Sequence, residues 1–196
     1  MTLGASKKRT TLRPIRESPD GHLGLTEVVA ACRSGDRDAQ HRLYEACHEA
    51  VYRLILRMVG LQDAADVLQQ VFLRGFRNID QFQGNSRFET WLYRLAVNEC
   101  FQHLRARRRG RFVRLEHEPM DQGPQQHRGE GKELLEAALA RLDADLRSVF
   151  LLREVEGLSY REMSRALGIS EGTVASRLNR ARRRLKEILA ELGWES

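Results

Sequence analysis

Polar and basic side chains share one face of a helix that the sequence predicts near its C-terminal end. From Ser170 to Lys186, residues with hydrogen-bond donors recur at steps of three and four, which places them together on an α-helix. Such side chains bind phosphates and the edges of base pairs in the major groove of DNA, and the free N–H groups of a helix start favour a phosphate. The predicted contacts with double-stranded DNA are Gly172, Thr173, Ser176, Arg177, Asn179, Arg180 and Arg183. Charge for further phosphate contacts comes from Arg182, Arg184 and Lys186.

A tight turn joins this helix to a short one before it. Ser159 and Glu162 have the spacing of a capping box that starts a helix, and Gly168 can adopt the left-handed conformation that ends it. Ile169 can fill the angle between the two helices, and Ser170 can cap the second. A charged helix alone is more often only a solvated surface. The turn, both caps and an apolar stripe together favour a helix-turn-helix that binds DNA.

The first half of the chain offers two further polar surfaces, and the residues alone leave their role open. One lies on a helix predicted over residues 63–79, and the other is the loop 81–89 that leads into a helix over 86–104. Each is more often an ordinary solvated surface. Phe88 and Trp91 lie on the apolar stripe and fit a core better than a base stack. The arginines that follow the second helix fit a nucleic-acid patch and a basic linker equally well.

The elements that position these residues are all predicted to be helices, so the fold class is all-α. Apolar residues recur at steps of three and four across 43–59 and along the two helices just described, with Asp63 as one cap and Ser86 with Glu89 as a capping box. A second set of apolar stripes runs over 134–192. We therefore predict two small helical bundles, the second with the helix-turn-helix, joined by a flexible linker.

Composition divides the chain into four segments. Residues 1–23 hold cations without an apolar period, which predicts a disordered basic tail. Residues 24–112 form the first predicted bundle and residues 132–194 the second. The stretch 113–131 between them is rich in glycine, glutamine and proline and has almost nothing apolar to bury, so it is predicted to be the linker.

Several classes of protein are excluded by what the 196 residues contain. The longest apolar run, Val28 to Cys32, is too short to span a bilayer, and no apolar stretch follows the basic start as an export signal requires. The three cysteines lie far apart without a C-x-x-C spacing, so neither a disulfide framework nor a zinc ribbon is indicated. We expect a reduced, cytoplasmic chain without membrane insertion.

No catalytic pattern is present among the polar residues. The six histidines are dispersed, and the sequence contains no H-E-x-x-H, no G-x-S-x-G and no phosphate-binding loop. We therefore expect no enzymatic activity, no cofactor and no metal site.

Two long stretches of this sequence resemble a known family. The run DAADVLQQVFLRGFRNIDQF followed by FETWLYRLAVNECFQHLRARRR closely resembles region 2 of bacterial sigma factors of the extracytoplasmic-function type. The run LDADLRSVFLLREVEGLSYREMSRALGISEGTVASRLNRARRRL resembles region 4 of the same family. The similarity covers about residues 25–112 and 132–192, in the order that this family has.

The resemblance implies a dissociable subunit of RNA polymerase that selects promoters and helps to melt them. The helix matching 171–186 would read the upstream (−35) element as duplex, by the residues named above. Residues implied to bind core RNA polymerase are Asp66, Gln69, Gln70, Leu73 and Arg74. Residues implied to bind the proximal (−10) element, with its melted non-template strand, are Gly84, Asn85, Ser86, Arg87, Phe88, Trp91, Asn98, Gln102 and Arg105.

Two further expectations concern partners. Members of the family are commonly held inactive by an anti-sigma factor that clamps both bundles, so the resemblance implies such a partner beside core polymerase and promoter DNA. The alternative function is a helix-turn-helix regulator that binds DNA without joining the polymerase; it would use residues 159–187 but not the 63–104 pattern.

Overall fold

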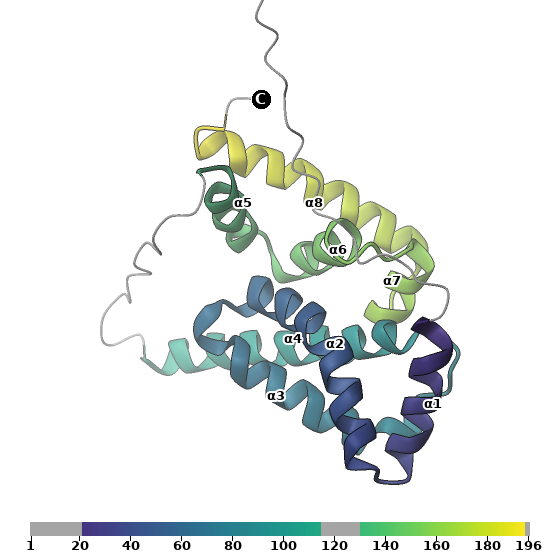
Figure 1. The fold of residues 1–196 in the computed structure, drawn as a ribbon. Helices are drawn as coiled ribbons and strands as arrows, with labels where there is room; N and C mark the ends of the chain where they lie inside the picture. The colour runs from purple at the N-terminus through teal and green to yellow at the C-terminus, as the bar shows by residue number, and fades with distance from the viewer. Residues whose placement is uncertain (1–20, 115–129, 195–196) are drawn as a thin grey trace, which may run out of the picture.

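The computed structural model describes residues 21–114 and 130–194, and every regular element in these ranges is a helix (Figure 1). This confirms the all-α fold class. The predicted tail lies outside the described residues up to position 20, and the predicted linker does so over 115–129. The elements are α1 (Gly21–Arg33), α2 (Arg37–Val59), α3 (Leu61–Arg77), the 3-10 helix η1 (Ile79–Gln81), α4 (Phe88–Arg114), α5 (Glu130–Arg141), α6 (Ala144–Glu154), α7 (Tyr160–Leu167) and α8 (Glu171–Glu191).

Helices α1 to α4 form the N-terminal bundle, with α2 packed against the other three. Asp36 starts α2, because its carboxylate accepts hydrogen bonds from the N–H groups of Asp38 (2.9 Å) and Ala39 (3.1 Å). Gly60 ends this helix with a φ of 92°, a conformation that favours glycine. The buried stripe of α2 comprises Ala39, Leu43, Cys47, Val51, Leu54, Ile55, Met58 and Val59.

Two helix starts differ from the predicted caps. α3 begins two residues before Asp63, so this carboxylate lies inside the first turn and pairs with side chains of α4 instead. α4 begins two residues after Ser86, whose Oγ donates a hydrogen bond to the Arg87 carbonyl oxygen (3.2 Å). In both places the side chain that local spacing assigns to a cap makes another contact.

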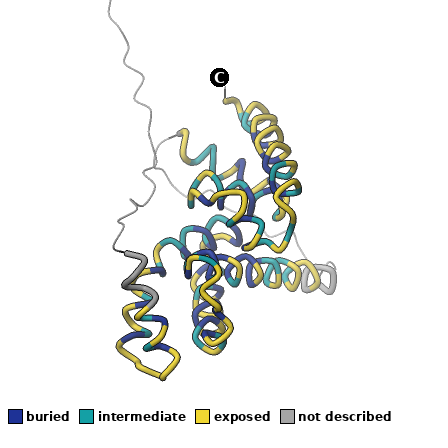
Figure 2. Tube along the Cα trace, turned by 90° about the vertical axis from the view of Figure 1, so that its right-hand side faces the viewer, coloured by how far each residue is buried: buried dark blue, intermediate teal, exposed yellow. Residues whose placement is uncertain are grey.

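Helices α5 to α8 form the C-terminal bundle. α8 packs across α5, α6 and α7 with a buried stripe that recurs every three or four residues. This stripe comprises Val174, Leu178, Ala181, Leu185 and Ile188. The opposite side of α8 faces solvent along its length (Figure 2).

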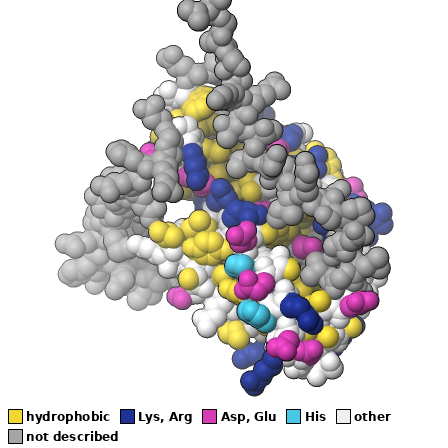
Figure 3. All heavy atoms as spheres, in the orientation of Figure 1, with side chains coloured by type: hydrophobic (Ala, Val, Ile, Leu, Met, Phe, Trp, Pro, Cys, Tyr) yellow, Lys and Arg dark blue, Asp and Glu magenta, His cyan; other side chains and the backbone are white. Residues whose placement is uncertain are grey.

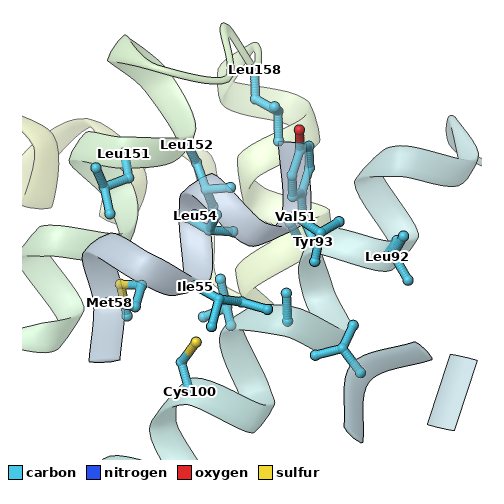
Figure 4. Packing of buried hydrophobic residues seen from close by; sticks show 14 of the residues in the cluster. Val51, Leu54, Ile55, Met58, Leu92, Tyr93, Cys100, Leu151, Leu152 and Leu158 are labelled. Carbon is cyan, nitrogen blue, oxygen red and sulfur yellow. The ribbon is translucent and has the colours of Figure 1, made fainter. Parts of the chain in front are cut away.

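The two bundles are stacked on each other, with the C-terminal bundle above the N-terminal one in Figure 1. α4 packs against α7, and α2 packs against α5 and α6. Buried residues of both bundles form one continuous apolar cluster. Figure 4 shows Leu151, Leu152 and Leu158 of the C-terminal bundle beside residues of α2 and α4. The sequence predicts the two bundles but not their contact, because an apolar stripe indicates that a helix face is buried and does not indicate which helix covers it.

The three cysteines are buried, and we expect them to be unreactive in the folded chain. Burial raises the pKa of the Cys47 and Cys100 thiols to about 12, since a thiolate is poorly stabilised away from water. At pH 8 the thiolate, which is the reactive form, is therefore scarce. A colorimetric thiol reagent should label these cysteines slowly in buffer and rapidly in guanidinium chloride. Equal rates under the two conditions would contradict this prediction.

Candidate nucleic-acid interface

The helix-turn-helix is built by local hydrogen bonds. In the capping box, the Ser159 N–H donates to Glu162 Oε2 (2.8 Å) and the Glu162 N–H donates to Ser159 Oγ (3.3 Å). Gly168 ends α7 in the left-handed conformation, with a φ of 67°. Ser170 then starts α8 by accepting a hydrogen bond from the Thr173 N–H (3.1 Å). These contacts fix the angle between α7 and α8, as the sequence predicts.

The solvent face of α8 carries the side chains that are free to bind a ligand. Asn179, Arg180 and Arg183 are exposed, and none of them has a polar side-chain partner among the described residues. Ser176 is also exposed, although its Oγ donates to the Thr173 carbonyl oxygen (3.0 Å). The first turn exposes Gly172, where a phosphate can approach the backbone N–H groups.

Three arginines of α8 are held by carboxylates of the same bundle. Arg177 Nη2 lies 3.3 Å from the Asp145 carboxylate. Arg182 makes two hydrogen bonds to Glu154 Oε1, at 3.1 and 2.6 Å. Arg184 pairs with two glutamates of its own helix, at 3.0 and 3.4 Å. These arginines tie α8 to its surroundings, so the cations left for phosphates are Arg180, Arg183 and Lys186.

A second polar face runs along α4 in the N-terminal bundle. Asn98, Gln102 and Arg105 are exposed at steps of four and three, so they lie on one side of the helix. Arg94 is exposed one turn earlier and extends this face. Arg94 is not among the residues predicted from the sequence, although its position four residues before Asn98 places it on the same side.

The loop before α4 presents backbone and small polar groups to solvent. Gly84 has a φ of 71°, and the Asn85 side chain donates a hydrogen bond to Gln83 Oε1 (3.1 Å). Ser86 is half-buried and Arg87 is exposed beside Glu89, at 4.0 Å. The predicted loop residues are thus together, at the start of the polar face of α4.

Aromatic side chains pack beneath the loop that precedes α4, on its side toward the core. Phe88 is only 6 % exposed and lies edge-on to Phe82, with ring centroids 5.3 Å apart. Trp91 is half-buried and completes the cluster, 5.4 Å from Phe88 and 5.8 Å from Phe82. Phe88 therefore acts as a core residue in this conformation, and Trp91 has only part of its ring in contact with solvent.

A third surface, on α3, combines polar and apolar side chains. Asp66, Gln69, Gln70, Leu73 and Arg74 are all exposed on this helix. A shallow groove of about 330 Å³ lies beside them between α2 and α3. Its apolar lining includes Tyr44, Tyr52, Leu68, Phe72, Leu73 and Phe76. On the face of the molecule shown in Figure 3, acidic, basic and apolar side chains are interspersed rather than gathered by charge.

Ion pairs join α3 to α4 behind these surfaces. Arg74 pairs with Glu99, a buried acid next to Asn98. At the other end of the contact, the Asp63 carboxylate lies 3.0 Å from His103 Nε2 and 3.3 Å from Arg107 Nη1. Because Glu99, His103 and Arg107 are one turn apart, they form a polar seam along α4. This seam fixes the direction in which the neighbouring face of Asn98 and Gln102 points.

Within 21–114 and 130–194 no group of three or more histidine, cysteine, aspartate or glutamate side chains is placed to hold a metal ion. In the same ranges no helix combines the length and the apolar character that crossing a membrane requires.

Comparison with protein families matches both halves of the chain. Residues 43–110 match the family model of sigma-70 region 2, and residues 132–185 match that of sigma-70 region 4. The chain is 33 % identical to the RNA polymerase sigma-H factor of Pseudomonas aeruginosa over 181 residues, covering 85 % of this chain and 94 % of that protein. It is 32 % identical to the ECF RNA polymerase sigma-E factor of Haemophilus influenzae over 179 residues, covering 84 % and 95 %.

Solved structures show the same architecture. CnrH, determined in complex with the cytosolic domain of CnrY, matches with a TM-score of 0.64 and 25 % identity over 84 % of this chain and 96 % of CnrH. The sigma factor RpoE of Bartonella quintana, determined with the anti-sigma factor NepR, matches with a TM-score of 0.63 and 26 % identity over 76 % and 96 %.

One of the two helical bundles contains a helix-turn-helix, which is typical of DNA-binding transcription factors. The order of the two family matches and the coverage of the relatives make the class more specific. The chain belongs to the extracytoplasmic-function sigma factors of bacterial RNA polymerase. As such it binds core RNA polymerase and directs promoter-specific initiation, which excludes the alternative of a regulator that acts without the polymerase. Its family consists of initiation factors and not of enzymes.

Proposed function

We propose that this sigma factor holds a promoter at two places and the polymerase at a third. The exposed side of α8, with Asn179, Arg180 and Arg183, reads the −35 element as duplex. The loop 84–87 and the α4 face of Asn98, Gln102 and Arg105 bind the −10 element. The observation that carries the proposal is that both faces consist of exposed polar side chains on helices fixed by the folded core.

Melting follows from the second of these surfaces. Extruding a base from the stack costs roughly a few kcal/mol, so a surface that binds the unpaired strand shifts the duplex toward opening. Asn98 and Gln102 supply amide groups for base edges, while Arg94 and Arg105 supply charge for the backbone. Phe88, inside the bundle, is proposed to support the loop rather than to stack on a base.

The α3 surface is proposed to bind core polymerase. Asp66, Gln69, Gln70 and Leu73 face solvent beside an apolar groove, which suits an interface with an apolar centre and a polar rim. Arg74 is proposed to act by positioning, because its guanidinium pairs with Glu99 of α4. The place of action is the cytoplasm, where the polymerase works. An anti-sigma factor is a further proposed partner, supported by the complex of the related RpoE with NepR.

Transcription in vitro tests the proposed function as a whole. Purified chain, core RNA polymerase and genomic DNA fragments should yield discrete transcripts whose start sites share two upstream elements. Core polymerase that initiates no better with the chain than without it would refute the function.

The role of α8 predicts how its arginines affect the salt dependence of promoter binding. Replacing Arg180 or Arg183 with alanine should lower the slope of log affinity against log salt by about one contact each, since each mutation removes one phosphate neutralisation. Arg184→Ala is the matched control, because Glu187 and Glu191 already bind that guanidinium. Titrations of holoenzyme with promoter DNA at several salt concentrations measure the slope. Unchanged slopes in both test variants would remove these arginines from the interface.

A further inference from the structure

Two arginines of α8 lie on opposite flanks of its buried stripe. Arg177 comes directly before the buried Leu178, and Arg182 comes directly after the buried Ala181. Since each residue of an α-helix is turned by about 100° from the one before it, the first arginine lies on one side of the stripe and the second on the other. When an α-helix lies in the major groove, the phosphates of the two strands run along its sides. Both arginines are therefore on the flanks where phosphates would lie.

Each of these arginines is held by a carboxylate of α6, the helix that packs beneath α8 (Figure 1). Asp145, in the first turn of α6, lies 3.3 Å from Arg177 Nη2. Glu154 is the last residue of α6, and its Oε1 accepts two hydrogen bonds from Arg182, from Nε at 3.1 Å and from Nη2 at 2.6 Å. The two ends of α6 therefore bind the two flanks of α8.

Both ion pairs lie at the surface, where a ligand can reach them. The four side chains are between 32 and 56 % exposed. An exposed ion pair is weak, and a DNA phosphate attracts a guanidinium by the same charge-assisted hydrogen bonds as a carboxylate does. Removing the charge of the carboxylate is therefore enough to change the partner of the arginine, and the apolar core beneath α8 stays as it is.

Other arginines of the same helix have no such partner. Arg180 and Arg183 are exposed, and no side chain in the described parts of the chain binds either of them. Arg182 and Arg183 are neighbours in sequence and are both exposed, so what separates them is the carboxylate that binds only the first. The two acids of α6 thus decide which cations of α8 are available to DNA.

We propose that Asp145 and Glu154 are positioning residues that limit how strongly α8 binds DNA of any sequence. They hold Arg177 and Arg182 on the protein, so these guanidiniums do not bind phosphates, which carry no sequence information. The side of α8 that is proposed to read bases is not involved. Because a genome offers at least about a million competing sites, weak sequence-independent binding leaves more of the chain available to core polymerase. The inference rests on the proposed role of α8 in binding DNA.

Glu154→Gln tests the inference in the full chain. Glutamine keeps the size of the side chain but accepts only a neutral hydrogen bond, which is about half as strong as a charged one. With Arg182 released, the affinity for a short duplex without promoter elements should rise about fivefold at about 0.1 M salt, and the slope of log affinity against log salt should steepen by about one contact. Fluorescence anisotropy of the labelled duplex at several salt concentrations measures both quantities. Asp145→Asn should have the same effect through Arg177.

Two controls separate the release of an arginine from the loss of a negative charge. Asp143→Asn removes the same charge just before α6, and within residues 21–114 and 130–194 the Asp143 side chain makes no capping hydrogen bond and no ion pair. It should leave the slope unchanged. Glu154→Gln combined with Arg182→Gln keeps the net charge and has no arginine to release, so it should bind the duplex as the unsubstituted chain does. If circular dichroism shows that Glu154→Gln does not fold, Asp145→Asn takes its place, with Arg177→Gln as the second substitution.

Three outcomes would overturn the inference: unchanged slopes in Glu154→Gln and Asp145→Asn, an equal rise of affinity in Asp143→Asn, or a rise that persists when Arg182 is also replaced. The duplex measurement contains no polymerase, so it is independent of the transcription test. Steeper slopes in a chain that never activates core polymerase would refute the proposed function and leave this inference standing. Unchanged slopes here, together with a lower slope in Arg180→Ala, would refute the inference alone.

Discussion

Replacing Leu73 with glutamate is expected to weaken binding of the chain to core RNA polymerase by at least a hundredfold. Leu73 is 42 % exposed on α3 and borders the apolar groove between α2 and α3. Apolar anchors at the centre of an interface carry much of the binding free energy. A carboxylate at this position would also have to leave water without a partner when polymerase covers it. Titration of a fluorescently labelled chain with core polymerase measures the affinity.

Leu61→Glu is the control for this substitution. Leu61 is 55 % exposed in the first turn of the same helix, where a negative charge is favoured by the helix dipole. Three turns of helix separate it from Leu73, and it lies on another side of α3. Binding of Leu61→Glu should stay within threefold of the unsubstituted chain. If Leu73→Glu keeps its melting temperature and still binds normally, α3 is not the polymerase contact.

Replacing both Asn98 and Gln102 with alanine should reduce promoter melting at least tenfold and leave binding of the −35 duplex unchanged. The two side chains are exposed on the same face of α4. They belong to a different bundle from α8, whose exposed side is proposed to bind the −35 duplex. If the two amides bind the unpaired strand as proposed, their removal takes away hydrogen bonds that form only after melting, and the closed complex is unaffected. Permanganate reactivity of thymines in the −10 region reports melting, and gel-shift titration reports duplex binding.

Gln62→Ala provides the comparison for this double substitution, because Gln62 is an exposed glutamine in the first turn of α3 and belongs to none of the proposed surfaces. It should melt the promoter normally. Full permanganate reactivity in the Asn98 and Gln102 variant would assign melting to other residues.

Features fixed by neighbours in the chain could be predicted from the sequence. The turn between α7 and α8 depends on Gly168, whose left-handed backbone needs no tertiary partner, and on Ser170, which caps the next three residues. The buried stripes of α2 and α8 follow from the 3.6-residue period in the same way. Asn98 and Gln102, which the family resemblance implies as site residues, lie on one exposed face of α4, and their binding of the −10 element stays a prediction.

Features fixed by distant partners could not be predicted. Arg182 is indistinguishable in sequence from Arg183, yet Glu154, 28 positions earlier, binds only the former. Asp63 has the spacing of a cap, but its partners His103 and Arg107 lie on another helix. Arg147 is one arginine among many until the folded chain brings the ends of α2 and α5 to its guanidinium. A one-dimensional pattern contains no signal for such pairings.

The polar seam between α3 and α4 holds these two helices in one orientation relative to each other. The side of α3 beyond the seam is proposed to touch polymerase, and the side of α4 beyond it to touch DNA. The contacts of Arg74 with Glu99 and of Asp63 with His103 oppose rotation of either helix against the other. The backbone positions of Asn98 and Gln102, which are proposed to bind DNA, are therefore set during folding, so the helix itself loses little conformational entropy when the strand binds. A rotation of α3 caused by bound RNA polymerase would therefore also turn α4 and the face of α4 that is proposed to bind DNA.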